Sequence, residues 1–302
     1  LIALSSAQLI AMETADIAAI TTGQISALTT GQISSLTTNQ VVALTSALVA
    51  SLKTSQLAAF STDQLAAMET ADFAALSTAQ ITALTTNQIR ALTTNQVVAL
   101  TTAQASKLSS AQLVSMTTQQ VAAMESVDLV SLTTAQVSSM TSAQIAALTT
   151  YQISKLLTAQ ISALSTQAIA AIETDDIAAL TTAQVAAMTT NQIKALATNQ
   201  VVALTTAQTA SLKTAQLLAF STNQLRALET TDFAALTTAQ LVVLLTSQIS
   251  SLSTAHIAAI TTSQISSLST NQLTAFTSSQ INALSTAQIS AMTSAQKKII
   301  GY

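Results

Sequence analysis

An eight-residue repeat runs through the chain without insertion or deletion, and it constrains the fold more than any other feature. Every eighth residue from Leu4 to Ile300 is Leu, Met, Ile or Phe, and all 7 methionines lie in this column. A second apolar residue stands three positions earlier in each repeat, and it is replaced only at Ala105, Thr209 and Lys297. Two positions after each column residue from Leu4 to Met292 comes Ser or Thr, without exception. The repeat unit is therefore an octad with two apolar sites and one hydroxyl site.

Neither a long helix nor a strand accommodates this octad. Eight residues advance a continuous helix by about 800°, so the apolar column would drift by about 80° per repeat. In a strand, two apolar sites three residues apart would point to opposite faces. One short helix per octad does place both sites on one face, as for Val41 and Leu44. We predict Thr38 and its equivalents as the N-caps; the alternative cap is Thr37, which would form a capping box with Gln40.

Such short helices are not stable alone, because helix nucleation costs more than one turn returns. Each octad must bury its apolar pair against other octads, which predicts an all-α solenoid that forms a rod. Three or four octads per coil give a bore that two apolar residues per octad can fill, whereas seven would leave a void. We expect one repeat domain over residues 1–302, of about 37 octads, as a segment of a larger protein.

Composition excludes several classes of function. Only 7% of residues are charged and the net charge is −3, so no basic surface for nucleic acid or anionic lipid is present. Mean hydropathy is +0.52, yet a Ser/Thr-Gln group interrupts every apolar cluster and no membrane span is predicted. The chain has no Cys and 1 His, which excludes disulfides and thiol chemistry. No catalytic constellation surrounds that His, so we expect no enzyme activity and no cofactor.

The glutamates mark a longer period of about 56 residues. Each of them begins the phrase E-[ST]-x-D, at intervals of 56, 56, 48 and 56 residues. The resulting carboxylate pairs are Glu13 with Asp16, Glu69 with Asp72, Glu125 with Asp128, Glu173 with Asp176, and Glu229 with Asp232. We interpret these pairs as structural and predict no metal site: the Asp, at the second helical position, favours the helix dipole, and the Glu pairs with a basic residue of a neighbouring coil. The alternative is that the pairs are candidate Ca²⁺ ligands, since Ca²⁺ takes several hard oxygens.

The remaining distinctive residues have structural interpretations. His256 stands in a column otherwise rich in Gln, which predicts a hydrogen-bonding role like that of Gln rather than a metal site. Stacked across coils, the Gln column would satisfy backbone groups where the helices break. Phe73 and Phe233 lie on apolar columns and are predicted core residues, whereas Tyr151 is predicted to be exposed. The alternative for the regular Thr/Gln surface is that it binds ice or a glycan.

Two resemblances to known proteins lie in the repeat itself. "LTTNQVVAL" at 36–44 resembles the start of a transcription-activator-like effector repeat, but that repeat's base-reading loop, second helix and basic stripe are missing. No DNA recognition is therefore carried over to this chain. L-[ST]-[ST]-x-Q-[IV]-x-[AS] arrays are similar to octapeptide regions of very large bacterial secreted or surface proteins, often described as adhesins.

The second resemblance implies an extracellular or cell-surface structural role: a stalk, a spacer or a fibre-forming subunit. Self-association, or packing against neighbouring repeats of a longer chain, follows from that role. The alternative is a binding module for a glycan, ice or another surface ligand. Its contact row would be the variable site after the first apolar residue, which holds Arg90, Val98, Lys194, Leu218 and Arg226.

Overall fold

The computed structural model describes all 302 residues, which form two compact helical units, Leu1–Leu156 and Leu157–Tyr302. No strand occurs, and there are 37 helices, one for each octad. The first unit contains α1 (Ser6–Ile10), α2 (Thr14–Ala18), α3 (Thr22–Ala27), α4 (Thr30–Ser35), α5 (Thr38–Val42), α6 (Ser46–Ser51), α7 (Thr54–Ala58), α8 (Thr62–Ala67), α9 (Thr70–Ala74), α10 (Thr78–Ala83), α11 (Thr86–Ala91), α12 (Thr94–Val98), α13 (Thr102–Ala105), α14 (Ser110–Ser115), α15 (Thr118–Ala123), α16 (Ser126–Ser131), α17 (Thr134–Ser139), α18 (Ser142–Ala146) and α19 (Thr150–Lys155). The second unit contains α20 (Thr158–Ala163), α21 (Thr166–Ala170), α22 (Thr174–Ala179), α23 (Thr182–Ala187), α24 (Thr190–Ala195), α25 (Thr198–Val202), α26 (Thr206–Ser211), α27 (Thr214–Ala219), α28 (Thr222–Ala227), α29 (Thr230–Ala234), α30 (Thr238–Leu241), α31 (Thr246–Ser251), α32 (Thr254–Ala259), α33 (Thr262–Ser267), α34 (Thr270–Thr274), α35 (Ser278–Asn282), α36 (Thr286–Ala291) and α37 (Ser294–Ile300). The prediction of one short helix per octad is confirmed.

The predicted position of the helix cap is wrong by one residue. Thr38 and its equivalents are the first helical residues, and the residue before them is the N-cap: Thr37 accepts a hydrogen bond from the backbone N–H of Gln40. Gln40 in turn accepts from the Thr37 N–H at 3.0 Å. This reciprocal pair satisfies two free N–H groups of the first turn, which a cap at Thr38 would not do. The capping box named above as the alternative is therefore the one that forms.

The helices are joined by two extended residues, the column residue and the following N-cap. Between α3 and α4, Leu28 has φ −60° and ψ 146°, and Thr29 has φ −72° and ψ 159°. Both conformations lie in the broad β region that any L-residue adopts. The chain therefore turns between helices without a tight turn, and this explains how so many breaks are built without proline and with only 3 glycines.

The two apolar sites of the octad form the core. Column residues such as Leu44 and first-site residues such as Val41 are buried along both units, with 2% and 0% of their surfaces exposed. Phe73 and Phe233 are buried and Tyr151 is exposed, as predicted. A core Val or Leu side chain stabilises a fold by about 1.5–3 kcal/mol, so stacking rather than helix propensity holds these short helices together.

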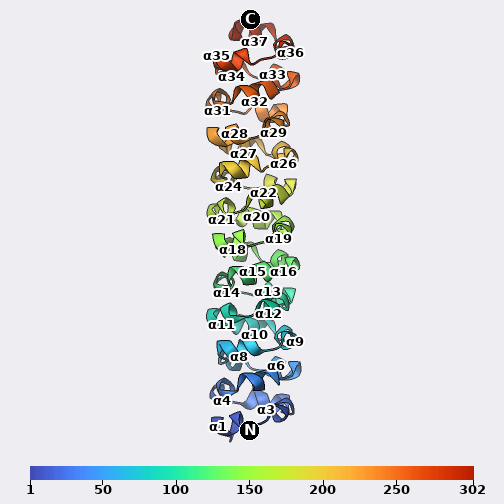
Figure 1. The fold of residues 1–302 in the computed structure, drawn as a ribbon, viewed down its shortest axis with the longest axis vertical. Coiled ribbons are helices and arrows are strands. Elements are labelled where there is room, and N and C mark those ends of the chain that lie inside the picture. The colour runs from blue at the N-terminus through green and yellow to red at the C-terminus, as the bar shows by residue number, and fades with distance from the viewer. The chain divides into compact units, whose positions relative to one another are not determined.

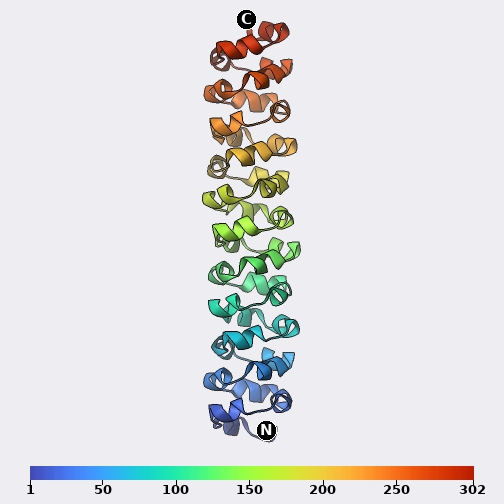
Figure 2. The same cartoon turned by 90° about the vertical axis from the view of Figure 1, so that its right-hand side faces the viewer.

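Within each unit the helices wind upward in successive coils, each lying on the one before (Figures 1 and 2). Each helix packs against the helix three octads further on, as α12 does against α15 and α26 against α29. Side chains also reach the helix four octads back, because Gln120 of α15 bonds carbonyls at the end of α11. One coil therefore holds more than three and fewer than four octads, and the predicted solenoid with three to four repeats per coil is confirmed for each unit. That residues 1–302 form one domain stays a prediction.

Candidate functional site

The Gln that follows each N-cap by three residues connects two coils. In α15, the Gln120 carbonyl oxygen accepts from the Thr117 N–H at 2.7 Å, which closes the capping box of its own helix. Its Nε2 donates to the backbone oxygens of Leu92 at 2.7 Å and Ile89 at 3.0 Å, at the end of α11. We call this arrangement the glutamine bridge. One side chain thus caps the start of one helix and the end of another.

The glutamine bridge answers a need created by the octad. A helix of five or six residues leaves most of its N–H and C=O groups without a partner inside the helix. The backbone carbonyl of the column residue is the last of these unpaired groups. Its burial without a hydrogen-bond donor costs about 1–3 kcal/mol of stability. Gln56 meets this need for Leu28 at 2.8 Å, and Gln216 meets it for Met188 at 2.8 Å. The Gln column is buried for this reason, and its members have little freedom to act on a ligand.

His256 replaces Gln in this bridge, as predicted. Its Nε2 lies 2.8 Å from the Leu228 oxygen, and its Nδ1 lies 2.5 Å from the Ser253 hydroxyl oxygen. The ring also packs edge-on against Phe233, with centroids 5.2 Å apart. Both ring nitrogens are thereby used inside the fold.

The acidic phrases replace the same Gln by Asp and the N-cap by Glu. The Asp is the third helical residue rather than the second, because the N-cap lies one position earlier than predicted. The five Glu side chains are exposed. Among the aspartates, Asp16 is exposed, whereas the other four are buried: Asp72, Asp128, Asp176 and Asp232.

Three of the buried aspartates, Asp72, Asp128 and Asp232, accept hydrogen bonds from hydroxyl groups of the coil below. Ser46 Oγ donates to Asp72 Oδ1 at 2.5 Å, and Thr206 Oγ1 donates to Asp232 Oδ1 at 2.6 Å. Within either unit no ion pair joins a glutamate to a lysine or arginine of a neighbouring coil, so the predicted pairing of Glu with a basic residue does not form there. The invariant hydroxyl of the octad is the group that reaches these carboxylates.

Asp128 is an acid whose surroundings disfavour its charged form. Burial raises the pKa of its carboxyl above the ordinary value, the hydrogen bond from Thr102 lowers it, and the negative charge of Glu125 raises it further. Its Oδ2 atom is buried and has no hydrogen-bond partner. The carboxylate therefore lies where its charged form is poorly stabilised.

The five candidate Ca²⁺ pairs remain separate along the chain. No group of three or more His, Asp or Glu side chains comes together, whereas a calcium site needs about 6–8 oxygens. Each pair is one Glu and one Asp at the start of a single helix, from Glu13–Asp16 to Glu229–Asp232. That these pairs hold no metal stays a prediction, and calcium binding stays its alternative.

The proposed contact row lies on the surface. All five of its residues are exposed: Arg90, Val98, Lys194, Leu218 and Arg226. Exposed apolar side chains occupy the same site in other octads: Ile10, Val42, Val114, Val202 and Val242. The longest helix has seven residues, and none has the length and apolar character that a membrane crossing requires.

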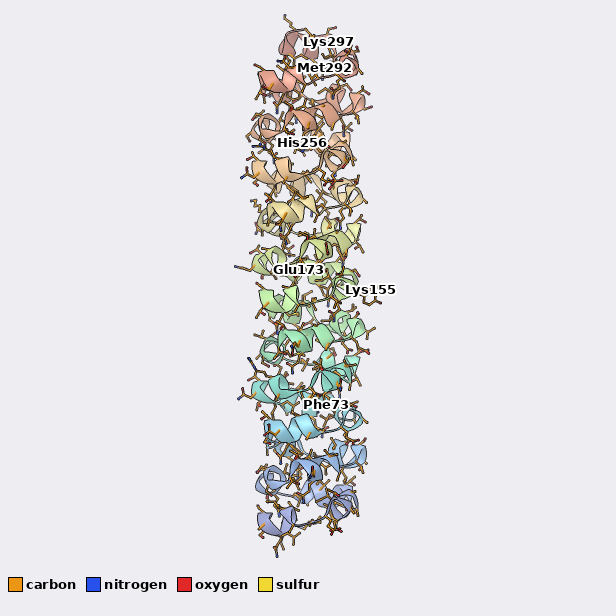
Figure 3. The ribbon with its side chains drawn as sticks, in the orientation of Figure 1. Phe73, Lys155, Glu173, His256, Met292 and Lys297 are labelled. Carbon is orange, nitrogen blue, oxygen red and sulfur yellow. The ribbon has the colours of Figure 1, made fainter.

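A shallow hollow in the first unit has an aromatic side chain in its wall. Ser126, Val127, Val130, Tyr151 and Lys155 line it. Val127 and Tyr151 are 60% and 64% exposed. The Lys155 side chain extends from the ribbon and its Nζ lies 5.0 Å from the centre of the Tyr151 ring (Figure 3). The hollow thus combines apolar contact area with one cation.

Sequence reasoning placed the Gln column at the helix breaks but missed its double role. We expected amides stacked upon amides, whereas each amide bonds an N–H of its own helix and carbonyls of another. The signal was present in the spacing, since S/T-x-x-Q is a capping-box pattern. The carbonyls that the amide bonds in the other helix depend on the number of octads per coil. The sequence limits this number to three or four but does not determine it.

Comparison with known protein families gives one match, and no curated protein matches the chain. The family model described as the ALTTAQ repeat matches overlapping segments that together cover residues 1–54, 65–102, 121–158, 169–206 and 209–297. The matches cover well over half of the chain, in both units.

Proposed function

Because the chain belongs to the ALTTAQ repeat family and uses its buried polar groups to join its own coils, we propose that it is a non-enzymatic structural repeat protein. In this proposal it acts as an extracellular stalk or spacer, or as a fibre-forming subunit, of a bacterial surface structure. Self-association or packing against further repeats of the same kind belongs to the same role.

One observation carries the proposal: the glutamine bridge recurs through both units and uses the side chains that ligand binding or catalysis would need. Gln40 bonds Leu9 and Met12, and Gln288 bonds Ile257 and Ile260, near the two ends of the chain. Each added octad therefore contributes the same stacking and the same bonds to its neighbours. Such a scaffold extends by repetition, which is what a stalk or a fibre requires.

Electron microscopy of the purified chain tests the structural role. We expect elongated particles of uniform width, and protease treatment of intact producing cells should release fragments of this repeat. Compact particles would contradict the stalk. So would a repeat that the protease cleaves in lysed cells but leaves completely uncleaved in intact cells.

A binding module is the second candidate, and the hollow beside Tyr151 favours it. An exposed Tyr ring offers a flat apolar face to a sugar ring, while Lys155 and Ser126 offer polar contacts. We expect Tyr151→Thr to abolish any retention on a glycan array, and Val42→Thr, at another exposed position of the same unit, to leave it unchanged. Equal retention of both variants would contradict this function.

A further inference from the structure

The acidic repeats interrupt the glutamine bridge at regular places. Elsewhere in the first unit, column carbonyls such as Leu36 and Leu92 receive an Nε2–H from Gln at 2.6 and 2.7 Å. At an acidic repeat the residue in the Gln position is Asp, whose ionised carboxylate has no hydrogen to donate. Three such repeats have both coils inside one unit: Asp72 above Leu44, Asp128 above Leu100, and Asp232 above Leu204.

The carbonyls below these aspartates have no donor. The oxygens of Leu44, Leu100 and Leu204 accept no backbone or side-chain hydrogen bond, in contrast to the equivalent oxygens below each Gln. The capping box is also missing in α9, α16 and α29, whereas the exposed Asp16 of α2 accepts from the Glu13 N–H at 3.3 Å. These three acidic repeats, whose aspartates are buried, therefore lack both halves of the bridge.

In these repeats a buried carboxylate takes the place of an amide that would donate to the carbonyl. Two hydrogen-bond acceptors then replace a donor and an acceptor, which is unfavourable. Only the hydroxyl of Ser46, Thr102 or Thr206 offsets it, by donating to one carboxylate oxygen. At Asp128 the other oxygen is buried without a partner. A proton on the carboxyl group converts one of its oxygens from acceptor to donor, which is the property that Gln brings to the same place.

The charged neighbours do not neutralise these carboxylates. Glu69, Glu125 and Glu229 share the helix starts with the aspartates and add negative charge. The titratable residues on or directly after the helices packed against α9, α16 and α29 are Lys53, Lys107, Tyr151, Lys155, Lys213 and His256. None of them forms an ion pair with an aspartate, and His256 already bonds Ser253 and Leu228.

We propose that the acidic repeat at Asp128 is a proton-sensitive junction, at which successive coils are held less tightly at neutral pH than at mildly acidic pH. Protonation of the Asp carboxyl supplies a donor between the coils and removes a buried charge. The raised pKa of Asp128 agrees with this direction. A folded-state pKa above the unfolded value means that the folded state binds the proton more tightly. Stability is therefore gained as pH falls through the folded pKa, and the gain is complete below the unfolded pKa.

Hydrogen exchange followed by mass spectrometry tests this junction. Exchange rates, corrected for the intrinsic effect of pH, are compared between pH 7 and pH 5 in the peptide that covers Leu100–Ala105. We expect the wild type to gain protection in this peptide at pH 5, because the folded state binds the proton of Asp128 more tightly. In the variant Asp128→Asn the amide does not titrate, so protection should be independent of pH.

Asp63→Asn provides the matched control, because Asp63 is an exposed residue in the first turn of α8. This variant should keep the full pH response of the wild type. A response of equal size in Asp128→Asn would overturn the proposal. The absence of any gain in the wild type would overturn it as well, and that result does not depend on the variant folding. An equal gain at pH 7 on addition of millimolar CaCl₂ would also overturn it, in favour of a bound cation. The stalk would survive either outcome, because particle shape does not depend on the protonation of these aspartates.

Discussion

Replacing one bridging Gln by Leu should loosen the contact between two coils without changing side-chain volume much. The variant is Gln120→Leu, in which the Thr117 N–H loses its acceptor and the Leu92 oxygen loses its donor at 2.7 Å. The lost capping bond costs about 1 kcal/mol. The buried carbonyl left without a partner costs about 1–3 kcal/mol. The Leu side chain recovers part of this by apolar burial, which leaves a net loss of about 2–3 kcal/mol.

The loss should be local, because each octad of a solenoid contacts only its neighbours. Native-state hydrogen exchange is the suitable assay, since it measures the opening of single segments rather than of the whole chain. A loss of about 2–3 kcal/mol corresponds to an increase of roughly 30- to 150-fold in the opening equilibrium of peptides from α11 and α15. Peptides several coils away should exchange as in the wild type.

Gln119→Leu is the matched control, because Gln119 precedes Gln120 in the same helix and its side chain is exposed. It changes the same atoms at a place where no bridge exists. Equal exchange in the two variants would refute the reasoning, since it would mean that the bridge contributes nothing beyond the chemistry of the substitution.

Four further variants test the remaining parts of the octad. Thr209 is fully buried and its hydroxyl has no partner, so Thr209→Val should raise the free energy of unfolding of its segment by about 1–2 kcal/mol in urea melts monitored by hydrogen exchange. Ala197→Thr should add the missing cap acceptor of α25 and stabilise it by about 1 kcal/mol in the same assay, and no change would contradict the cap assignment. Leu48→Gln should lower the free energy of unfolding by less than about 1 kcal/mol, because Leu48 occupies a bridge position. Leu57→Gln in the apolar core should lower it by at least about 3 kcal/mol. Equal losses in the two variants would remove the distinction between the two buried columns.

The octad made most of the fold predictable. Leu4 and its equivalents determined the period, the apolar pair such as Val41 and Leu44 determined the helical face, and close packing limited the coil to three or four octads. The cap was misplaced because we gave weight to an unvarying hydroxyl, Thr38 and its equivalents, over the less regular position before it. Backbone geometry decides otherwise: Thr37 is extended with φ −74° and ψ 158°, as an N-cap is.

The candidate site was less predictable, because it depends on which octads lie above one another. The phrase E-[ST]-x-D was visible, but the sequence does not say that Asp128 is buried in the position where other octads place Gln over the carbonyl 28 residues earlier, rather than beside a lysine. That pairing follows from residues 28 positions apart, as for Gln120 and Leu92, and it appears only once the number of octads per coil is known.

The invariant hydroxyl has a different explanation from the one its regularity suggested. It does not cap its helix, and at most repeats it lies exposed or half-buried on the surface. At the acidic repeats it is the donor to the buried carboxylate, as Ser46 is for Asp72 and Thr206 for Asp232. A hydroxyl at every octad means that an acidic repeat can arise at any position and find a donor three octads earlier. The spacing of the acidic repeats is then free to change by whole octads, and their intervals of 56 and 48 residues differ by one octad.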